Sequence, residues 1–175
     1  INNQGGMEAI NEALYQLPTA EQIYEPEKYF SGEVYENVII EDLIVTDYNL
    51  VKEGTIGALD IPYILQDTIG RVASVKAAIG LGGGAWKDYV NSSQQLMMSL
   101  KMTGDTPEDL EEIYNAYIAW ANAQERFTSV ESFEGGMLYI GDTNVWISND
   151  STHVRMLLTQ DLEIFNEITT QISRF

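Results

Sequence analysis

Residues 61–100 read IPYILQDTIG RVASVKAAIG LGGGAWKDYV NSSQQLMMSL, and the fold assignment depends mainly on them. In 61–79 apolar side chains recur at helical spacing, and Pro62 suits a first helical turn. A second apolar stripe at the same spacing runs from Trp86 to Leu100. Because the glycine-rich run 80–84 lies between the stripes, the pattern predicts two amphipathic helices joined by a flexible turn.

A third helix is predicted to begin at Pro107. Gly104 can stop the preceding element, Asp105 or Thr106 can cap the new helix, and proline is favoured at its first position. Acidic residues in the first turn also suit the helix dipole. The apolar side of this helix extends to about Ser129, so we expect 61–130 to be a three-helix region.

The flanking segments are predicted from shorter patterns. Residues 8–17 have helical spacing up to Pro18, whereas 34–51 fit a strand or a helix, and the pattern leaves both open. The runs 137–140 and 145–147, separated by a turn-like segment, predict a β-hairpin. An apolar stripe over 154–175 predicts a final helix.

Together these patterns predict an α+β fold that is predominantly helical. We expect four to five helices packed as a bundle-like core, a small β-hairpin, and room for one further strand pair in the acidic N-terminal half. The length suits one domain, which would bury roughly 70% of its unfolded surface. Its parts would be an acidic segment (1–60), the three-helix region (61–130) and a hairpin plus C-terminal helix (137–175).

Charge excludes several functions. The 27 acidic and 9 basic residues give a formal net charge of −18, which disfavours direct binding to nucleic acid or anionic lipid. The chain has no cysteine, which removes disulfides, thiolate zinc sites and cysteine nucleophiles. No apolar run approaches the roughly 20 residues of a membrane span, so we expect no membrane insertion of this segment.

Motifs for catalysis or cofactors are weak. His153 is the one histidine, and no serine in a nucleophile-elbow motif accompanies it. The glycine run lacks the context of a phosphate loop. Oxygen-rich turns make Asp142, Asn144 and Asp150 candidate calcium ligands, although the calcium-hand spacing is missing. We therefore expect no cofactor and a chain that is not an enzyme.

Aromatic residues supply the candidate binding surface. Tyr117 and Trp120 fall on the predicted third helix, and Trp120 lies off its main apolar stripe. With Trp86 and Trp146 they are the residues we expect to line a ligand pocket or a partner surface.

The leading hypothesis is a non-catalytic, acidic binding or sensor-type interaction module that binds a protein partner or a small ligand. The chain begins at Ile1 and not at methionine, which leaves open a removed leader or anchor and a piece of a longer chain. We expect an extracytoplasmic location: secreted, periplasmic or at the cell surface. The first alternative is a structural subunit of a filament, surface layer or particle, a homo-oligomer assembling through 154–175. Two further alternatives are a nucleic-acid mimic presenting the acids of 21–60 and a carboxylate-dependent hydrolase.

Overall fold

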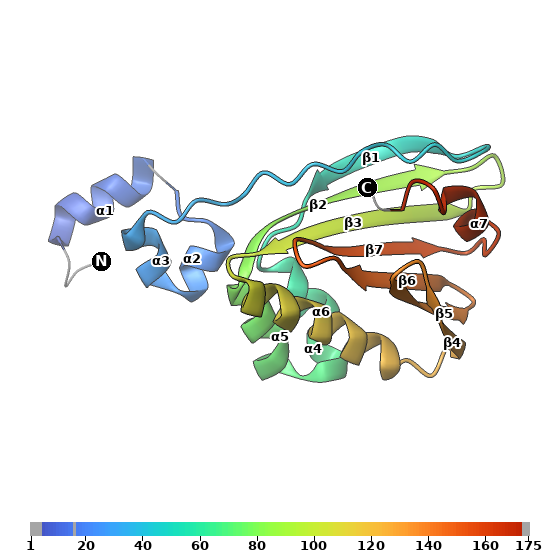
Figure 1. Ribbon diagram of the computed structural model, residues 1–175. Helices are drawn as coiled ribbons and strands as arrows, with labels where there is room; N and C mark the ends of the chain where they lie inside the picture. The colour runs from blue at the N-terminus through green and yellow to red at the C-terminus, as the bar shows by residue number, and fades with distance from the viewer. Residues whose placement is uncertain (1–4, 16, 173–175) are drawn as a thin grey trace.

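The computed structural model describes residues 5–15 and 17–172. Its centre is a seven-stranded antiparallel sheet with the order β1-β2-β3-β7-β6-β5-β4 (Figure 1). The strands are β1 (Asn49–Thr55), β2 (Leu81–Val90), β3 (Leu96–Gly104), β4 (Phe127–Phe133), β5 (Gly136–Gly141), β6 (Asn144–Asn149) and β7 (Val154–Thr159). The prediction of a predominantly helical, bundle-like core is therefore wrong.

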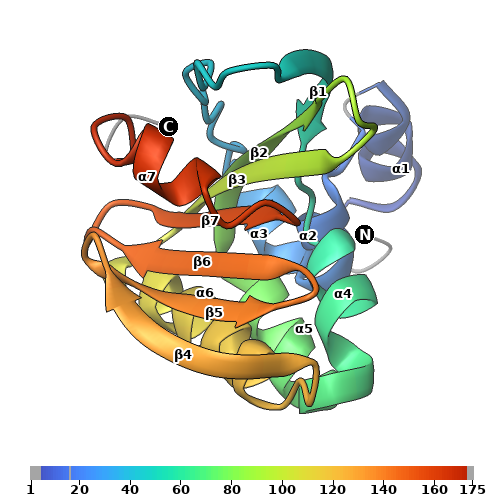
Figure 2. The ribbon, with the colours of Figure 1, turned by 90° about the vertical axis from the view of Figure 1, so that its right-hand side faces the viewer.

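Helices and an extended segment cover the two faces of this sheet. One face carries α4 (Asp60–Ile69), α5 (Arg71–Ile79) and α6 (Pro107–Asn122), as Figure 2 shows. The other face carries α7 (Ile164–Ile168) and residues 33–48, an extended segment that we call the strap. Three helices precede the strap: α1 (Gly6–Tyr15), α2 (Ala20–Tyr24) and α3 (Pro26–Ser31).

Each face has its own apolar core. On the helical side, Leu65 and Ile113 are fully buried against strand residues such as Ile147. On the other side, strap residues pack with Phe165 of α7 against the sheet. Because apolar layers sandwich the sheet, its central strands are buried on both faces.

The strap has extended backbone, but none of the strands that the structure describes pairs with it as a ladder. Val38 and Ile40 are buried whereas Ile39 between them is 70% exposed, which is the alternation of extended backbone. The side chain of Gln171 replaces a neighbouring strand at Ile44: it accepts from the Ile44 N–H (2.9 Å) and donates to the Ile44 carbonyl (2.8 Å). The open question over 34–51 resolves into this strap followed by β1.

The glycine run is part of β2 and not an interhelical turn. Beside Gly82 and Gly83 the strap lies directly against β2, and the Glu36 N–H donates to the Gly82 carbonyl at 2.7 Å. A Cβ on Gly83 would lie 2.1 Å from the Glu36 carbonyl oxygen. Glycine is therefore needed for close approach of two backbones.

Two predicted helices are strands for a common reason. The stripe from Trp86 to Leu100 forms the β2–β3 hairpin. Of the stripe over 154–175, residues 173–175 lie outside the described residues, and the described part begins with β7 and has the short α7 as its one helix. Strands that are buried on both faces do not alternate between apolar and polar residues. Their apolar residues form nearly continuous runs, and such runs also fit the spacing of a helix.

Local signals were more reliable. The helix from Pro107 is confirmed: Thr106 caps α6, and its Oγ1 accepts from the Asp109 N–H at 3.1 Å, although α6 ends at Asn122. The hairpin over 137–147 is confirmed as β5 and β6. The stripe over 61–79 is helical but divided at Gly70, whose φ is +84°.

Candidate functional site

The structure does not gather the four predicted aromatic residues into one pocket. Trp146 is 1% exposed in the core beneath α7, and its Nε1 donates to the Phe133 carbonyl at 2.8 Å. Tyr117 and Trp120 of α6 are buried in the core on the helical side. Trp86, on β2, is partly buried and lines a pocket.

We take this pocket of about 250 Å³, the Trp86 pocket, as the candidate site. It lies between the first three strands and α4, on the helical side of the sheet. Its lining residues are Thr55, Ile56, Asp60, Ile64, Trp86, Asp88, Met98 and Leu100. Most of the wall is apolar, and two carboxylates supply its charge.

Strand register places the key side chains together. Trp86 pairs with Leu100 and Asp88 pairs with Met98 across the β2–β3 ladder. Residues two apart on a strand share a face, and directly paired residues do too. Trp86 and Asp88 therefore lie side by side on the face that α4 partly covers.

Gly54 on β1 fixes the position of the indole. It pairs with Trp86, and a Cβ at this position would lie 2.8–2.9 Å from three adjacent ring atoms of Trp86. The ring therefore lies over the glycine backbone, an arrangement in which an aromatic side chain covers an edge-strand glycine.

One carboxylate oxygen of Asp88 lacks a hydrogen-bond donor among the described residues. This oxygen, Oδ1, is buried. Burial raises the pKa of Asp88 above its usual value, and the positive charge of Lys52 offsets only part of this effect. A buried carboxylate oxygen without a donor is unfavourable, so this atom is suited to accept a donor from a ligand.

Lys52 already places a cation beside the pocket. It pairs with Asp88 across the β1–β2 ladder, and its Nζ lies 5.4 Å from the centroid of the Trp86 ring. This is a cation–π distance. On the opposite wall Asp60 opens α4, and its Oδ2 accepts from the Gly57 N–H at 2.8 Å.

These features favour one kind of ligand group. An aromatic face, an unsatisfied carboxylate and an apolar wall together suit an ammonium or guanidinium group on an aliphatic stem. An anion would face Asp60 and Asp88 and be repelled.

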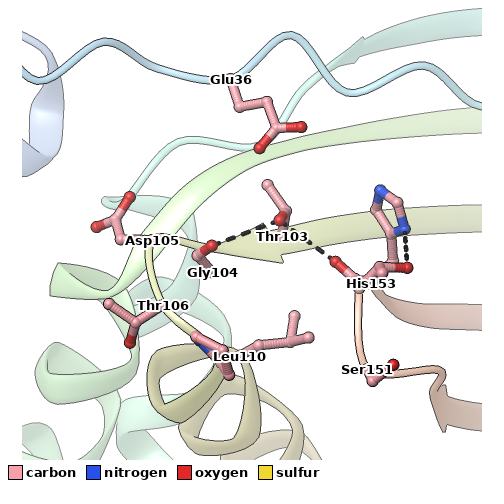
Figure 3. A pocket seen from close by; sticks show the side chains of 10 residues that line it. Glu36, Thr103, Gly104, Asp105, Thr106, Leu110, Ser151 and His153 are labelled. Atoms are coloured by element: carbon pink, nitrogen blue, oxygen red, sulfur yellow. Dashed lines mark hydrogen bonds between the residues drawn. The ribbon is translucent and has the colours of Figure 1, made fainter.

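A second hollow, of about 270 Å³, surrounds Thr103 at the far end of β3 (Figure 3). Burial lowers the pKa of His153, and the charges of Lys101 and Arg155 lower it further. The His153 ring lies at the edge of the hollow, away from Thr106, and its Nδ1 is 2.9 Å from the Thr152 Oγ1.

Several polar groups of this hollow already have partners within the protein. Thr103 Oγ1 donates to the Thr152 carbonyl at 3.3 Å, and Thr106 Oγ1 is bonded within its own helix cap. Asp105 binds Lys28. Among the described residues, this hollow has no buried side-chain polar atom without a hydrogen-bond partner, whereas the Trp86 pocket has Asp88 Oδ1.

An acidic cluster at the base of α2 is occupied by an internal cation. Glu21, Glu33 and Asp105 have carboxylate oxygens within 4.8 Å of one another. The Nζ of Lys28 contacts all three, at 2.6 Å from Glu21 and 3.1 Å from Glu33, and donates to the Ile79 carbonyl at 2.6 Å. The ammonium therefore fills the place that a metal ion would take.

The three candidate calcium ligands do not lie together. Asp142 and Asp150 flank opposite ends of β6, whose six residues span about 20 Å at ~3.3 Å each. Asn144 is 2% exposed and donates through its Nδ2 to the Thr159 carbonyl at 3.2 Å. Asp150 accepts from Arg155 at 2.5 Å, and its hydrogen bonds hold its pKa far below the usual range despite partial burial.

The comparisons with known proteins identify no relative: no family model, curated protein or solved structure matches the chain. Within residues 5–15 and 17–172, no helix is long and apolar enough to cross a bilayer.

Proposed function

We propose that the chain is a non-catalytic binding module whose ligand presents a positively charged nitrogen group to the Trp86 pocket. The observation that carries this proposal is the buried Asp88 Oδ1, which accepts no hydrogen bond from any residue within 5–15 and 17–172. It lies beside an aromatic ring that has the Lys52 ammonium at cation–π distance. The net charge of −18 supports it, because a negative surface attracts cations over long range. An extracytoplasmic location stays part of the proposal.

The test is an NMR titration with two small probes. N-acetyl-lysine methylamide carries the ammonium, and N-acetyl-norleucine methylamide has a similar aliphatic stem without it. We expect the lysine probe to shift the Trp86 indole and Asp88 amide signals and the norleucine probe to leave them nearly unchanged. Affinity should fall as the pH drops through the raised pKa of Asp88, because protonation removes the acceptor charge.

Two variants separate the site from net charge. Asp88→Asn should weaken binding of the lysine probe by about tenfold or more, since a hydrogen bond to a charged group contributes about 1.5–3 kcal/mol. Asp142→Asn removes the same charge from the exposed β5–β6 turn and should bind as the parent protein does. Equal losses in both variants, or no shifts at Trp86 with the lysine probe, would overturn the proposal.

The structural-subunit alternative is favoured by a different observation. Met7, Leu14 and Leu17 recur at helical spacing in or just after α1 and are 67–77% exposed. Light scattering at low and high salt tests this alternative, since it requires a stable oligomer of the chain alone.

A further inference from the structure

The strand above the Trp86 pocket is an open edge of the sheet. β1 is the terminal strand and hydrogen-bonds within the sheet to β2 alone. Its residues are exposed except for Gly54, which is partly buried. An edge strand presents alternate backbone N–H and C=O groups that can pair with another extended chain.

The pocket and this edge are parts of one surface. Thr55 of β1 lines the pocket, and Gly54 packs on its indole. From the same strand, Lys52 reaches the ring. A strand added to β1 would lie about 4.8 Å farther out, a gap that the long stem of a lysine or arginine can span.

The charge of the chain and the exposed apolar side chains of β1 indicate what kind of partner would bind at this edge. Asp42 and Glu53 near this edge have side chains 65% and 64% exposed, although both lie close to Lys87. Leu50 and Val51 expose 40% and 59% of their surface on β1. A second copy of the chain would bring a further net charge of −18 and be repelled. A basic, extended peptide complements the negative charge of the chain and can contact the exposed apolar positions of β1.

We infer that the charged group in the Trp86 pocket is a lysine or arginine side chain of a basic peptide that binds as an added strand on the free edge of β1. This inference rests on the function proposed above and specifies its partner. Backbone pairing would supply affinity, and the pocket would select the basic residue, as in other strand-addition complexes.

The test uses a seven-residue peptide, as long as β1, with lysine and valine in alternation. Two isomers carry N-methyl groups on alternate residues, in one phase or the other, so only one isomer loses the N–H groups that face β1. A fourth peptide replaces the central lysine by norleucine. Calorimetry gives the affinities, and amide shifts of β1 are compared with those of β4, the other terminal strand.

We expect one N-methylated isomer to bind as the parent peptide does. The other should bind at least about tenfold more weakly, because it loses three or four backbone hydrogen bonds. The affinity of the norleucine peptide should also be about tenfold lower than that of the parent peptide. The changes in amide chemical shift on binding should concentrate in β1. Equal affinities of the two isomers, or shifts concentrated in β4, would overturn strand addition. If the single-lysine probe still binds at Trp86 in that case, the proposed function stands; if it does not bind, both fail.

Discussion

Replacing Glu21 by glutamine should stabilise the fold at pH 8 and change little at pH 4. Glu21 is 7% exposed, and its carboxylate shares the one ammonium of Lys28 with Glu33 and Asp105. Burial raises the pKa of Glu21 from 4.5 to about 7; the hydrogen bond from Lys28 acts in the opposite direction, and the charge of Asp105 adds to the rise. Three carboxylates around one cation are thus best accommodated when one of them keeps its proton.

The sign and size follow from linkage. A group whose folded pKa is raised gives stability that is complete below its unfolded pKa, here 4.5, and is lost as the pH rises through about 7. At about 1.4 kcal/mol for each pH unit, full ionisation of Glu21 costs up to about 3 kcal/mol. Glutamine keeps an oxygen that can accept from Lys28 without this cost. We expect a gain of about 1–3 kcal/mol at pH 8, since the ion pair with Lys28 is lost at the same time.

Urea unfolding at pH 4, 6 and 8 measures this difference. Glu27→Gln is the control: Glu27 is an exposed acid in the neighbouring α3, and its substitution removes the same charge. The Glu21→Gln gain should grow from pH 4 to pH 8, whereas the control should lack that trend. The reasoning would be refuted if Glu21→Gln lowered the free energy of unfolding, and lowered it more at pH 8 than at pH 4. The ion pair with Lys28 would then outweigh the cost of burying the Glu21 carboxylate.

Two further substitutions test the strap and the pocket. Gly54→Ala places a Cβ 2.8 Å from the Trp86 ring, so we expect a loss of about 1–3 kcal/mol in urea unfolding and a displaced Trp86 indole signal; the exposed neighbour Val51→Ala is the control, and an unmoved signal contradicts the packing. Gln171→Ala removes both hydrogen bonds to Ile44, so exchange of the hydrogen-bonded amides of Leu43 and Thr46 on either side should accelerate by about tenfold. Exposed Gln160→Ala should leave it unchanged. Equal exchange in both variants would show that the Gln171 hydrogen bonds do not hold the strap.

The sequence predicted elements that are determined locally. The Thr106 cap and Pro107 fix the start of α6 through groups within one turn, so a short motif contains the necessary information. The β5–β6 hairpin is similarly local, since a short turn joins its strands. The N-terminal helix, predicted over 8–17, begins at Gly6 and ends at Tyr15.

The elements that were missed depend on distant partners. Gly83 must lack a side chain because the Glu36 carbonyl lies against it, and no local pattern links these two residues. β2, β3 and β7 are sandwiched between helices on one face and the strap or α7 on the other. Their apolar residues thus appear on both sides of each strand, and periodicity alone could not separate strand from helix.

The sequence predicted only part of the candidate site, because the rest of it also depends on distant contacts. Trp86 was singled out by residue type, but Asp88 reads as one acid among 27 until β2 is recognised as a strand. Strand geometry then puts Asp88 beside Trp86, and the β1 register adds Lys52 opposite it. Asp60 joins them only because α4 packs beneath this edge. What distinguishes Asp88 from the other acids is therefore a tertiary property, a buried oxygen without a donor. The ammonium or guanidinium group of the ligand proposed above would supply the donor that this oxygen lacks.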